Sequence, residues 1–234
     1  MRLDKYLANM GQGTRSQVKR LIAKGAVSIN GKVAKSAKQQ IDQLNDVVVL
    51  EGHRIDYRPF IYLMMNKAAG YISSTEKGET PTVLDCVPAE YRHYELFPVG
   101  RLDKDTTGLL LITNDGQLAH RLLAPRHHVA KTYRVACALP LSDRQVEHLA
   151  NGVLIAGGYQ TKPAEVHQIA DYQIDLTIYE GKYHQVKQML AAVGNRVVAL
   201  ERIAFAGLVL DKNLQRGQVR LLSTDELTAL TNKK

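Results

Sequence analysis

One short segment of the chain places a carboxylate where it could do chemistry. Residues 100–105 form a charged turn, Gly-Arg-Leu-Asp-Lys-Asp, and the apolar run 109–113 follows closely. A buried strand in that run would hold Asp103 on a loop beside a rigid sheet, where reactive groups are often carried. Such an aspartate can serve as a nucleophile or as a base, although a loop aspartate can also simply cap a backbone turn.

A helix predicted over residues 184–193 carries a lysine at the edge of its buried stripe. The apolar side chains run from Val186 to Val193, Gly194 ends the helix, and Lys187 lies at the margin of the stripe. An ionised aspartate in a pocket from which water is excluded is costly unless a cation compensates its charge. Asp103 in such a pocket therefore needs a basic partner, whereas a lysine at the margin of a buried stripe ordinarily faces solvent.

A tyrosine is expected to point into the core from the strand predicted over residues 131–137. Tyr133 alternates with Val135 and Cys137, so the three side chains should share the inward face. Most inward tyrosines are simply packed.

The N-terminal part of the chain reads as two helices followed by a hairpin. The first helix spans 3–10 and the second begins near 14–16 and ends at Gly25, while the pair Asn30-Gly31 favours a tight turn between two short strands. Arg15, Lys19 and Lys24 fall on the polar side of the second helix. They form either a solvated helix face or a surface for a polyanion.

Charge and composition narrow the class of protein. The 234 residues carry a net charge of +8 at a sequence pI near 9.4, and residues 1–50 hold nine Lys or Arg against three Asp, a local excess of +6. This surplus indicates polyanionic partners. Cys86 and Cys137 have no metal-ligand spacing, and the chain has neither a secretory signal nor a run of roughly 20 apolar residues. A soluble, cytoplasmic protein is expected.

The distribution of elements predicts two domains of unequal size. A polar linker is expected over 51–59, and from residue 60 the chain alternates apolar strands (60–65, 94–99, 109–113 and 131–137) with short helices. That order indicates an α+β fold around a largely antiparallel sheet with flanking helices. We expect a small N-terminal domain over residues 1–58 and a larger domain over 59–234.

Residues 100–116 closely resemble the active-site signature of the RsuA-type ribosomal RNA pseudouridine synthases, and this resemblance extends over nearly the whole chain. It implies that Asp103 is the catalytic aspartate, which either attacks the ribose or removes a proton from it. The helix pair and hairpin of residues 1–58 resemble the alpha-L RNA-binding motif shared with the small-subunit ribosomal protein four family. RNA contact is therefore implied for Arg15, Lys19 and Lys24.

The same resemblance assigns roles to further residues. Lys187 would be the basic partner of Asp103, and Tyr133 would stack on the target base and help to remove the C5 proton. Arg101 would open or hold the flipped nucleotide, with a structural salt bridge as the alternative. RNA contact is also expected from the 125–128 element, which holds Arg126, His127 and His128.

A first motif, usually Asn-Lys-Pro-x-Gly in this family, is matched by residues 66–70. Ala68 replaces the proline, so a fixed φ angle is lost. Lys67 and Gly70 would support the active-site loop, and Lys67 is also expected among the RNA-binding residues. Gln188 occupies a position where a second basic residue is common.

The implied activity is isomerisation of one uridine of 16S ribosomal RNA by a monomer that works on small-subunit assembly particles without cofactor or metal. A metal site at His120, His127 and His128 is disfavoured. Glycoside hydrolysis by a pair of carboxylates is also disfavoured, because exposure explains Asp105, and a turn and helix start explain Asp115. Two alternatives stay open. The chain could be a sibling synthase for large-subunit rRNA, or a non-catalytic RNA-binding ribosome assembly factor.

Overall fold

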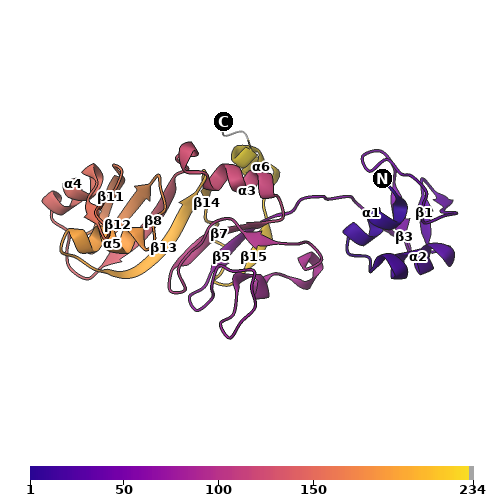
Figure 1. Cartoon of the computed structure of the whole chain (residues 1–234), viewed down its shortest axis with the longest axis horizontal. Coiled ribbons are helices and arrows are strands. Elements are labelled where there is room, and N and C mark those ends of the chain that lie inside the picture. Colours follow the sequence, from indigo (N-terminus) through magenta and orange to yellow (C-terminus); the bar gives the residue numbers. More distant parts are fainter. Residues whose placement is uncertain (232–234) are drawn as a thin grey trace. The chain divides into compact units, whose positions relative to one another are not determined.

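The computed structural model describes residues 1–231, and this part of the chain folds as two compact units (Figure 1). One unit contains residues 1–61 together with 88–95, and the other contains 62–87 and the residues from 96 onward. Neither unit contains a helix, within the described residues, with both the length and the apolar character that crossing a membrane requires.

In the N-terminal unit, two helices pack on a small sheet as predicted. Helix α1 (Leu3–Asn9) buries Leu3, Tyr6 and Leu7, and helix α2 (Arg15–Ala23) buries Val18 and Ile22 in the same core. Thr14 caps α2, because its side chain accepts a hydrogen bond from the backbone of the residue three positions on, whose own side chain bonds back.

The sheet of this unit has the strand order β2-β1-β3-β4 and is antiparallel throughout. Asn30 and Gly31, with φ of 49° and 76°, form the predicted turn between β1 (Val27–Ile29) and β2 (Lys32–Val33). The next pair is β3 (Val48–Leu50) and β4 (His53–Ile55). The linker predicted over 51–59 is therefore wrong for residues 53–55. A turn at residues 51–52 reverses the chain direction, and residues 53–55 pair with β3 as the polar, exposed edge strand β4.

The second unit is built on a nine-stranded mixed sheet, which confirms the predicted α+β class. Its central path has the order β11-β12-β8-β13-β7-β5-β15, and β14 and β6 pair with β13 and β7. All of these pairs are antiparallel except β13 with β7. The strands are β5 (Tyr62–Lys67), β6 (Phe97–Pro98), β7 (Thr107–Thr113), β8 (Lys131–Cys137), β11 (Glu165–Ala170), β12 (Gln173–Ile178), β13 (Val197–Phe205), β14 (Leu208–Val209) and β15 (Val219–Leu221).

Helices cover parts of this sheet, and a small hairpin lies beside one of them. Helices α4 and α5 lie beside the half of the sheet that contains β11, β12 and β8. Helices α3 and α6 lie beside the half that contains β7 and β15 (Figure 1). The hairpin β9–β10 packs on α5. The bounds are α3 (Gly116–Leu123), α4 (Asp143–Asn151), α5 (Gln185–Ala192), α6 (Thr224–Thr231), β9 (Leu154–Ile155), β10 (Tyr159–Gln160) and the 3-10 turns Val83–Cys86, Ala89–Tyr91 and Pro125–His127.

The strand predicted over 94–99 is much shorter in the structure. Only Phe97–Pro98 pairs with β7, because Tyr94 instead packs against the core of the N-terminal unit, where its hydroxyl contacts the sulfur of Met10. By contrast, β8 has the predicted bounds. Strand β7 begins at Thr107 and is buried from Gly108 onward, so the turn at 100–105 leads directly into the core.

Candidate active site

The loop that carries Asp103 is held in place by a buried lysine. Lys67, at the end of β5, is 0% exposed, and its Nζ donates to the backbone oxygens of Asp103 (3.0 Å), Lys104 (3.2 Å) and Thr106 (2.8 Å). It also donates to the oxygen of Ala68 at 3.1 Å. One ammonium thus satisfies several carbonyls of a turn that would otherwise leave them unpaired.

Two further residues of the same segment fix the loop from its other side. The backbone N–H of Gly70 donates to the oxygen of Lys104 at 2.9 Å, and Ser73 exchanges two hydrogen bonds with the backbone of Leu102, each of 3.1 Å. The loop is therefore held even though Ala68 replaces the proline. A contact between Lys67 and RNA does not fit its complete burial, which leaves the loop-supporting role as the one we propose.

Each oxygen of the Asp103 carboxylate has its own basic neighbour. Lys187 Nζ lies 3.1 Å from Oδ2, and His184 Nε2 lies 3.5 Å from Oδ1. Both neighbours come from the start of α5, and the Asp103 side chain keeps 30% of its surface exposed. The carboxylate thus lies between a lysine ammonium and an imidazole, and it is still accessible to a substrate.

Lys187 is shared between two carboxylates, which the sequence did not indicate. Its Nζ lies 2.7 Å from Asp105 Oδ1, so it bridges Asp105 and Asp103. Burial opposes the charged form of Lys187, but its hydrogen bonds to the two carboxylates outweigh that effect and raise the pKa of the lysine. The hydrogen bond from Lys187 lowers the pKa of Asp105. Asp105 is 72% exposed, as expected, but exposure does not describe its whole role.

His184 was not identified from the sequence as a partner of Asp103. It precedes α5 in the left-handed conformation, with φ of 48°, and its ring stacks on Tyr183 at 3.8 Å between centroids. Gln188 holds this turn, because its amide donates to the oxygen of Tyr183 at 2.6 Å and accepts from the N–H of Ala156 at 3.0 Å. The glutamine thus connects the turn to the β9–β10 hairpin.

Tyr133 points inward from β8, as the alternation predicted, and is 8% exposed. Its register partners are Leu176 on β12 and Arg202 on β13. Within the described residues no hydrogen bond joins Tyr133 to Asp103. Its cross-strand neighbour on the same face of the sheet is instead Arg202, a buried residue that the sequence patterns did not indicate.

The other predicted RNA-contacting residues of this unit lie at the surface. Arg101 is exposed, and no carboxylate of residues 1–231 forms an ion pair with it, so the alternative of a structural salt bridge is not observed. Arg126, His127 and His128 are also exposed, and His128 Nδ1 lies 2.9 Å from Lys162 Nζ. No group of three or more metal-ligating side chains is found in the described part of the chain.

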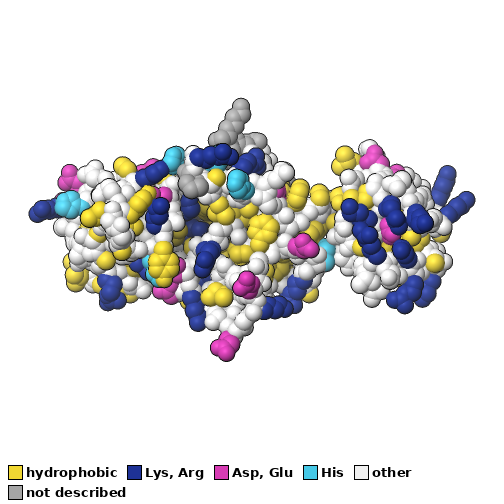
Figure 2. Space-filling model, viewed as in Figure 1, with side chains coloured by type: hydrophobic (Ala, Val, Ile, Leu, Met, Phe, Trp, Pro, Cys, Tyr) yellow, Lys and Arg dark blue, Asp and Glu magenta, His cyan; other side chains and the backbone are white. Residues whose placement is uncertain are grey.

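Basic side chains also gather on the N-terminal unit. Arg15, Lys19 and Lys24 are exposed on α2 or at its end, whereas Val18 and Ile22 of the same helix are buried. Figure 2 shows many Lys and Arg side chains on the visible face of this unit. Their exposure is compatible with RNA contact and equally with a solvated helix face.

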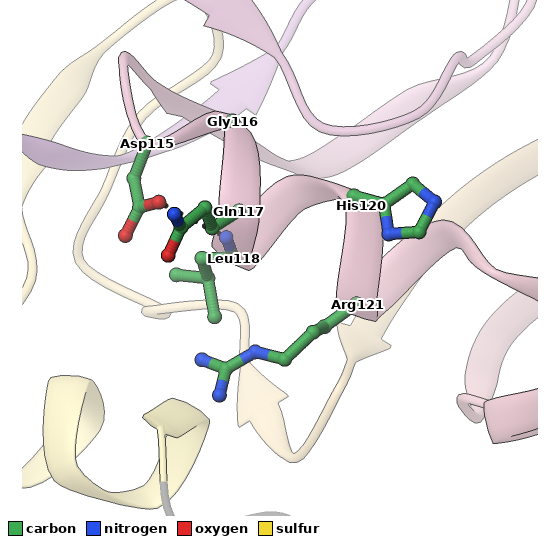
Figure 3. A pocket seen from close by; sticks show the side chains of 6 residues that line it. All are labelled: Asp115, Gly116, Gln117, Leu118, His120 and Arg121. Atoms are coloured by element: carbon green, nitrogen blue, oxygen red, sulfur yellow. Dashed lines mark hydrogen bonds between the residues drawn. The ribbon is translucent and has the colours of Figure 1, made fainter.

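A shallow hollow lies at the start of α3, and none of the predicted site residues lines it (Figure 3). Asp115 caps the helix there by accepting from the backbone of Leu118 at 3.0 Å, and it also accepts from the hydroxyl of Tyr62 at 2.9 Å. These contacts confirm the interpretation of Asp115 as a turn and helix-start residue. The hollow is lined by Asp115, Gly116, Gln117, Leu118, His120 and Arg121.

Sequence comparison identifies two families along the chain. Residues 61–192 match the family described as RNA pseudouridylate synthase, and residues 1–48 match the S4 domain. The first match covers more than half of the chain and contains Asp103, Tyr133 and Lys187.

Relatives match over nearly the full length. YtzG of Bacillus subtilis (strain 168), named as an uncharacterized RNA pseudouridine synthase, is 50% identical, with 98% of each chain covered. Ribosomal small subunit pseudouridine synthase A of Escherichia coli (strain K12) is 40% identical, with 98% of this chain and all of the relative covered. A crystal structure of a pseudouridylate synthase superimposes with a TM-score of 0.70 at 40% identity, covering 98% of this chain and 99% of the other.

Proposed function

Since the chain belongs to the RNA pseudouridylate synthase family, we propose that it converts one uridine of 16S ribosomal RNA to pseudouridine, with Asp103 as the catalytic carboxylate. Several full-length relatives are named as small-subunit pseudouridine synthases, which supports the choice of RNA. Action on ribosomal RNA would place the enzyme in the cytoplasm.

The observation that carries this proposal is the setting of Asp103. Its carboxylate lies 3.1 Å from the Lys187 ammonium, on a loop held by Lys67, and still has exposed surface. A nearby cation compensates the charge of a carboxylate that a bound nucleotide would cover. The loop fixes where that carboxylate meets the substrate.

The reaction requires one carboxylate and a rotation of the base. Asp103 either attacks the ribose C1′ or removes the C2′ proton, and both routes break the N1–C1′ bond. The freed uracil then turns and rejoins the sugar through C5, whose proton is finally removed. Tyr133 would stack on the base, and the target nucleotide must leave its helix to reach the site, as enzymes that act on a base generally require.

RNA binding is divided between the two domains in this proposal. Residues 1–58 would hold structured RNA through Arg15, Lys19 and Lys24, and residues 59–234 would carry out the reaction. Arg101 and the 126–128 element would contact RNA near the site. Because Asp103, Lys187 and His184 all come from one chain, a monomer is sufficient, acting on 16S rRNA in assembling small subunits.

Loss of the carboxylate tests the assignment. Asp103→Asn should abolish tritium release from 16S rRNA transcripts labelled at uracil C5 and leave RNA binding intact. The comparison variant Asp105→Asn should lose only a small part of the activity, because Asp103 keeps its lysine. Retained turnover in Asp103→Asn would refute the catalytic role.

The two alternatives are separated by mapping pseudouridines in cells that lack the protein. One missing site in 16S rRNA is expected. A missing site in large-subunit rRNA would instead identify the sibling activity, and an unchanged map would identify a non-catalytic assembly factor.

A further inference from the structure

Arg202 is a buried cation without an anionic partner. It lies in the middle of β13, is 1% exposed, and forms no ion pair with any carboxylate of residues 1–231. Its Nε donates to the oxygen of Leu109 at 2.8 Å, its guanidinium lies 4.8 Å from the ring centroid of Phe205, and its Nη2 has no hydrogen-bond partner among the described residues. A protein rarely keeps such a costly group for packing alone.

The remaining contact of Arg202 is with Tyr133. The two residues lie directly opposite each other on β13 and β8, so their buried side chains share one face of the sheet as nearest cross-strand neighbours. Burial lowers the pKa of the guanidinium, and Tyr133 opposes that shift. Among the described residues, the tyrosine is therefore the acidic group whose charge would favour the charged form of Arg202.

The backbone around Arg202 connects this pair to the Asp103 loop. Arg202 pairs with Gly108 on β7, and β7 begins four residues after Asp103. A Cβ on Gly108 would lie 2.3 Å from the oxygen of Arg202, so the two strands approach as closely as the backbone allows. This packing leaves Arg202 little freedom to move away from Tyr133.

We propose that Arg202 is a positioning residue that holds the Tyr133 oxygen for removal of the uracil C5 proton. The inference deepens the proposed function and rests on it. A phosphate of the RNA is not the partner of Arg202, because the buried guanidinium has no accessible surface for one.

In the rejoined base, C5 carries both the ribose carbon and a proton, and C6 is double-bonded to N1. The Tyr133 oxygen, after giving its own proton to water, takes the C5 proton and becomes a phenol again. The C5–H electron pair forms the C5=C6 bond, the C6=N1 pair moves to N1, and N1 takes a proton from water. During this step the tyrosine oxygen carries negative charge, which the fixed guanidinium of its cross-strand neighbour Arg202 would stabilise.

Two RNA probes distinguish a role of Arg202 in C5 proton removal from a purely structural role. The first is a 16S rRNA transcript labelled with tritium at uracil C5, and the second is the same transcript made with 5-fluorouridine, whose C5 has no proton to remove. Arg202→Met should lower kcat for tritium release by about 100-fold with little change in KM, the size expected for a group that assists proton transfer. Rearrangement of the fluorinated base should stay near the wild-type rate.

Double substitution tests whether Arg202 acts through Tyr133. In a Tyr133→Phe background, Arg202→Met should add little further loss, because the oxygen that it serves is already gone. Arg134→Met is the matched control: Arg134 neighbours Tyr133 on β8 but pairs with Asp175 at 2.9 Å and is partly exposed, so it should keep activity.

Several outcomes would overturn the inference. Equal losses with both RNA probes, additive losses in the double variant, or an equal loss in Arg134→Met would each assign Arg202 to structure alone. If Arg202→Met does not fold, Arg202→Lys keeps the charge and allows the same cycle with Tyr133→Phe. A wild-type protein that releases no tritium would instead refute the proposed function.

Discussion

Lys187 lies closer to Asp105 than to Asp103, at 2.7 Å against 3.1 Å. The lysine is therefore a bridge between the proposed catalytic carboxylate and an exposed neighbour. The bridge fixes the ammonium from two sides, and the charge of Asp105 helps to keep the lysine protonated.

Removing the bridging charge should impair catalysis more than removing its outer partner. We expect Lys187→Met to lower kcat for tritium release by on the order of 100-fold, as for the loss of one preorganised charged group in an active site. Lys187→Arg should recover part of this loss, and Asp105→Asn should have a small effect because Asp103 keeps its lysine. A larger loss in Asp105→Asn than in Lys187→Met would contradict this assignment.

The buried ammonium of Lys67 should leave a signature in the pH dependence of stability. Burial lowers its pKa to about 8 from 10.5, so between these values the unfolded chain binds a proton that the folded chain lacks. The free energy of unfolding contributed by this group therefore rises with pH across that window, by up to about 3 kcal/mol.

Chemical denaturation from pH 7 to 10.5 measures this difference for Lys67. The wild-type curve should rise relative to that of Lys67→Met, and parallel curves would show that the ammonium keeps an ordinary pKa. Comparison of the two proteins removes the contribution of other titrating groups.

Close strand packing should make Gly108 irreplaceable. Gly108→Ala combines a φ of +99° with a Cβ placed 2.3 Å from a backbone oxygen, so we expect a loss of more than about 3 kcal/mol in the free energy of unfolding. Gly157→Ala is the matched control, since it has φ of +80° and nothing within 4 Å of the added Cβ. It should cost about 1 kcal/mol, from backbone conformation alone. Similar losses in both variants would disprove the close approach.

A hydroxyl without a partner in the Asp103 loop should be dispensable for folding. Thr106 is buried, and its Oγ1 has no hydrogen-bond partner in the described residues. Thr106→Val keeps the shape and removes this polar atom, so the free energy of unfolding should rise by about 1 kcal/mol. A loss of stability would show that the hydroxyl has a partner in solution, such as a bound water.

The basic helix face should determine how binding responds to salt. Replacing Arg15, Lys19 and Lys24 by Gln should weaken 16S rRNA binding and flatten the slope of log K against log[salt] by about 0.7–0.9 for each lost phosphate contact. The control replaces Lys32, Lys35 and Lys38, which carry the same charge outside α2. An unchanged slope in the α2 variant would mean that this face does not contact phosphates.

Local patterns in the sequence were sufficient to predict much of the fold. The helix pair, the Asn30-Gly31 hairpin and strand β8 follow from periodicity and turn residues that act over a few positions. The linker failed at residues 53–55, because a polar edge strand has no buried alternation to distinguish it from a loop. Pairing across the chain cannot be read from such patterns at all.

The candidate site was only partly predictable for the same reason. Asp103 is identified by its local motif, but its contact with Lys187 joins residues 84 positions apart and was expected only from family resemblance. Arg202 was missed because a charged residue in a strand is normally taken to face solvent. Its alternation with the buried Leu200 was the available signal.

Lys67 donates its hydrogen bonds to the main chain of the Asp103 loop, and every amino acid possesses the carbonyl groups that accept them. Side chains such as that of Lys104 can therefore be substituted during evolution while Asp103 keeps its position. Related enzymes can in this way differ in the RNA sequence that they prefer and still catalyse the same reaction.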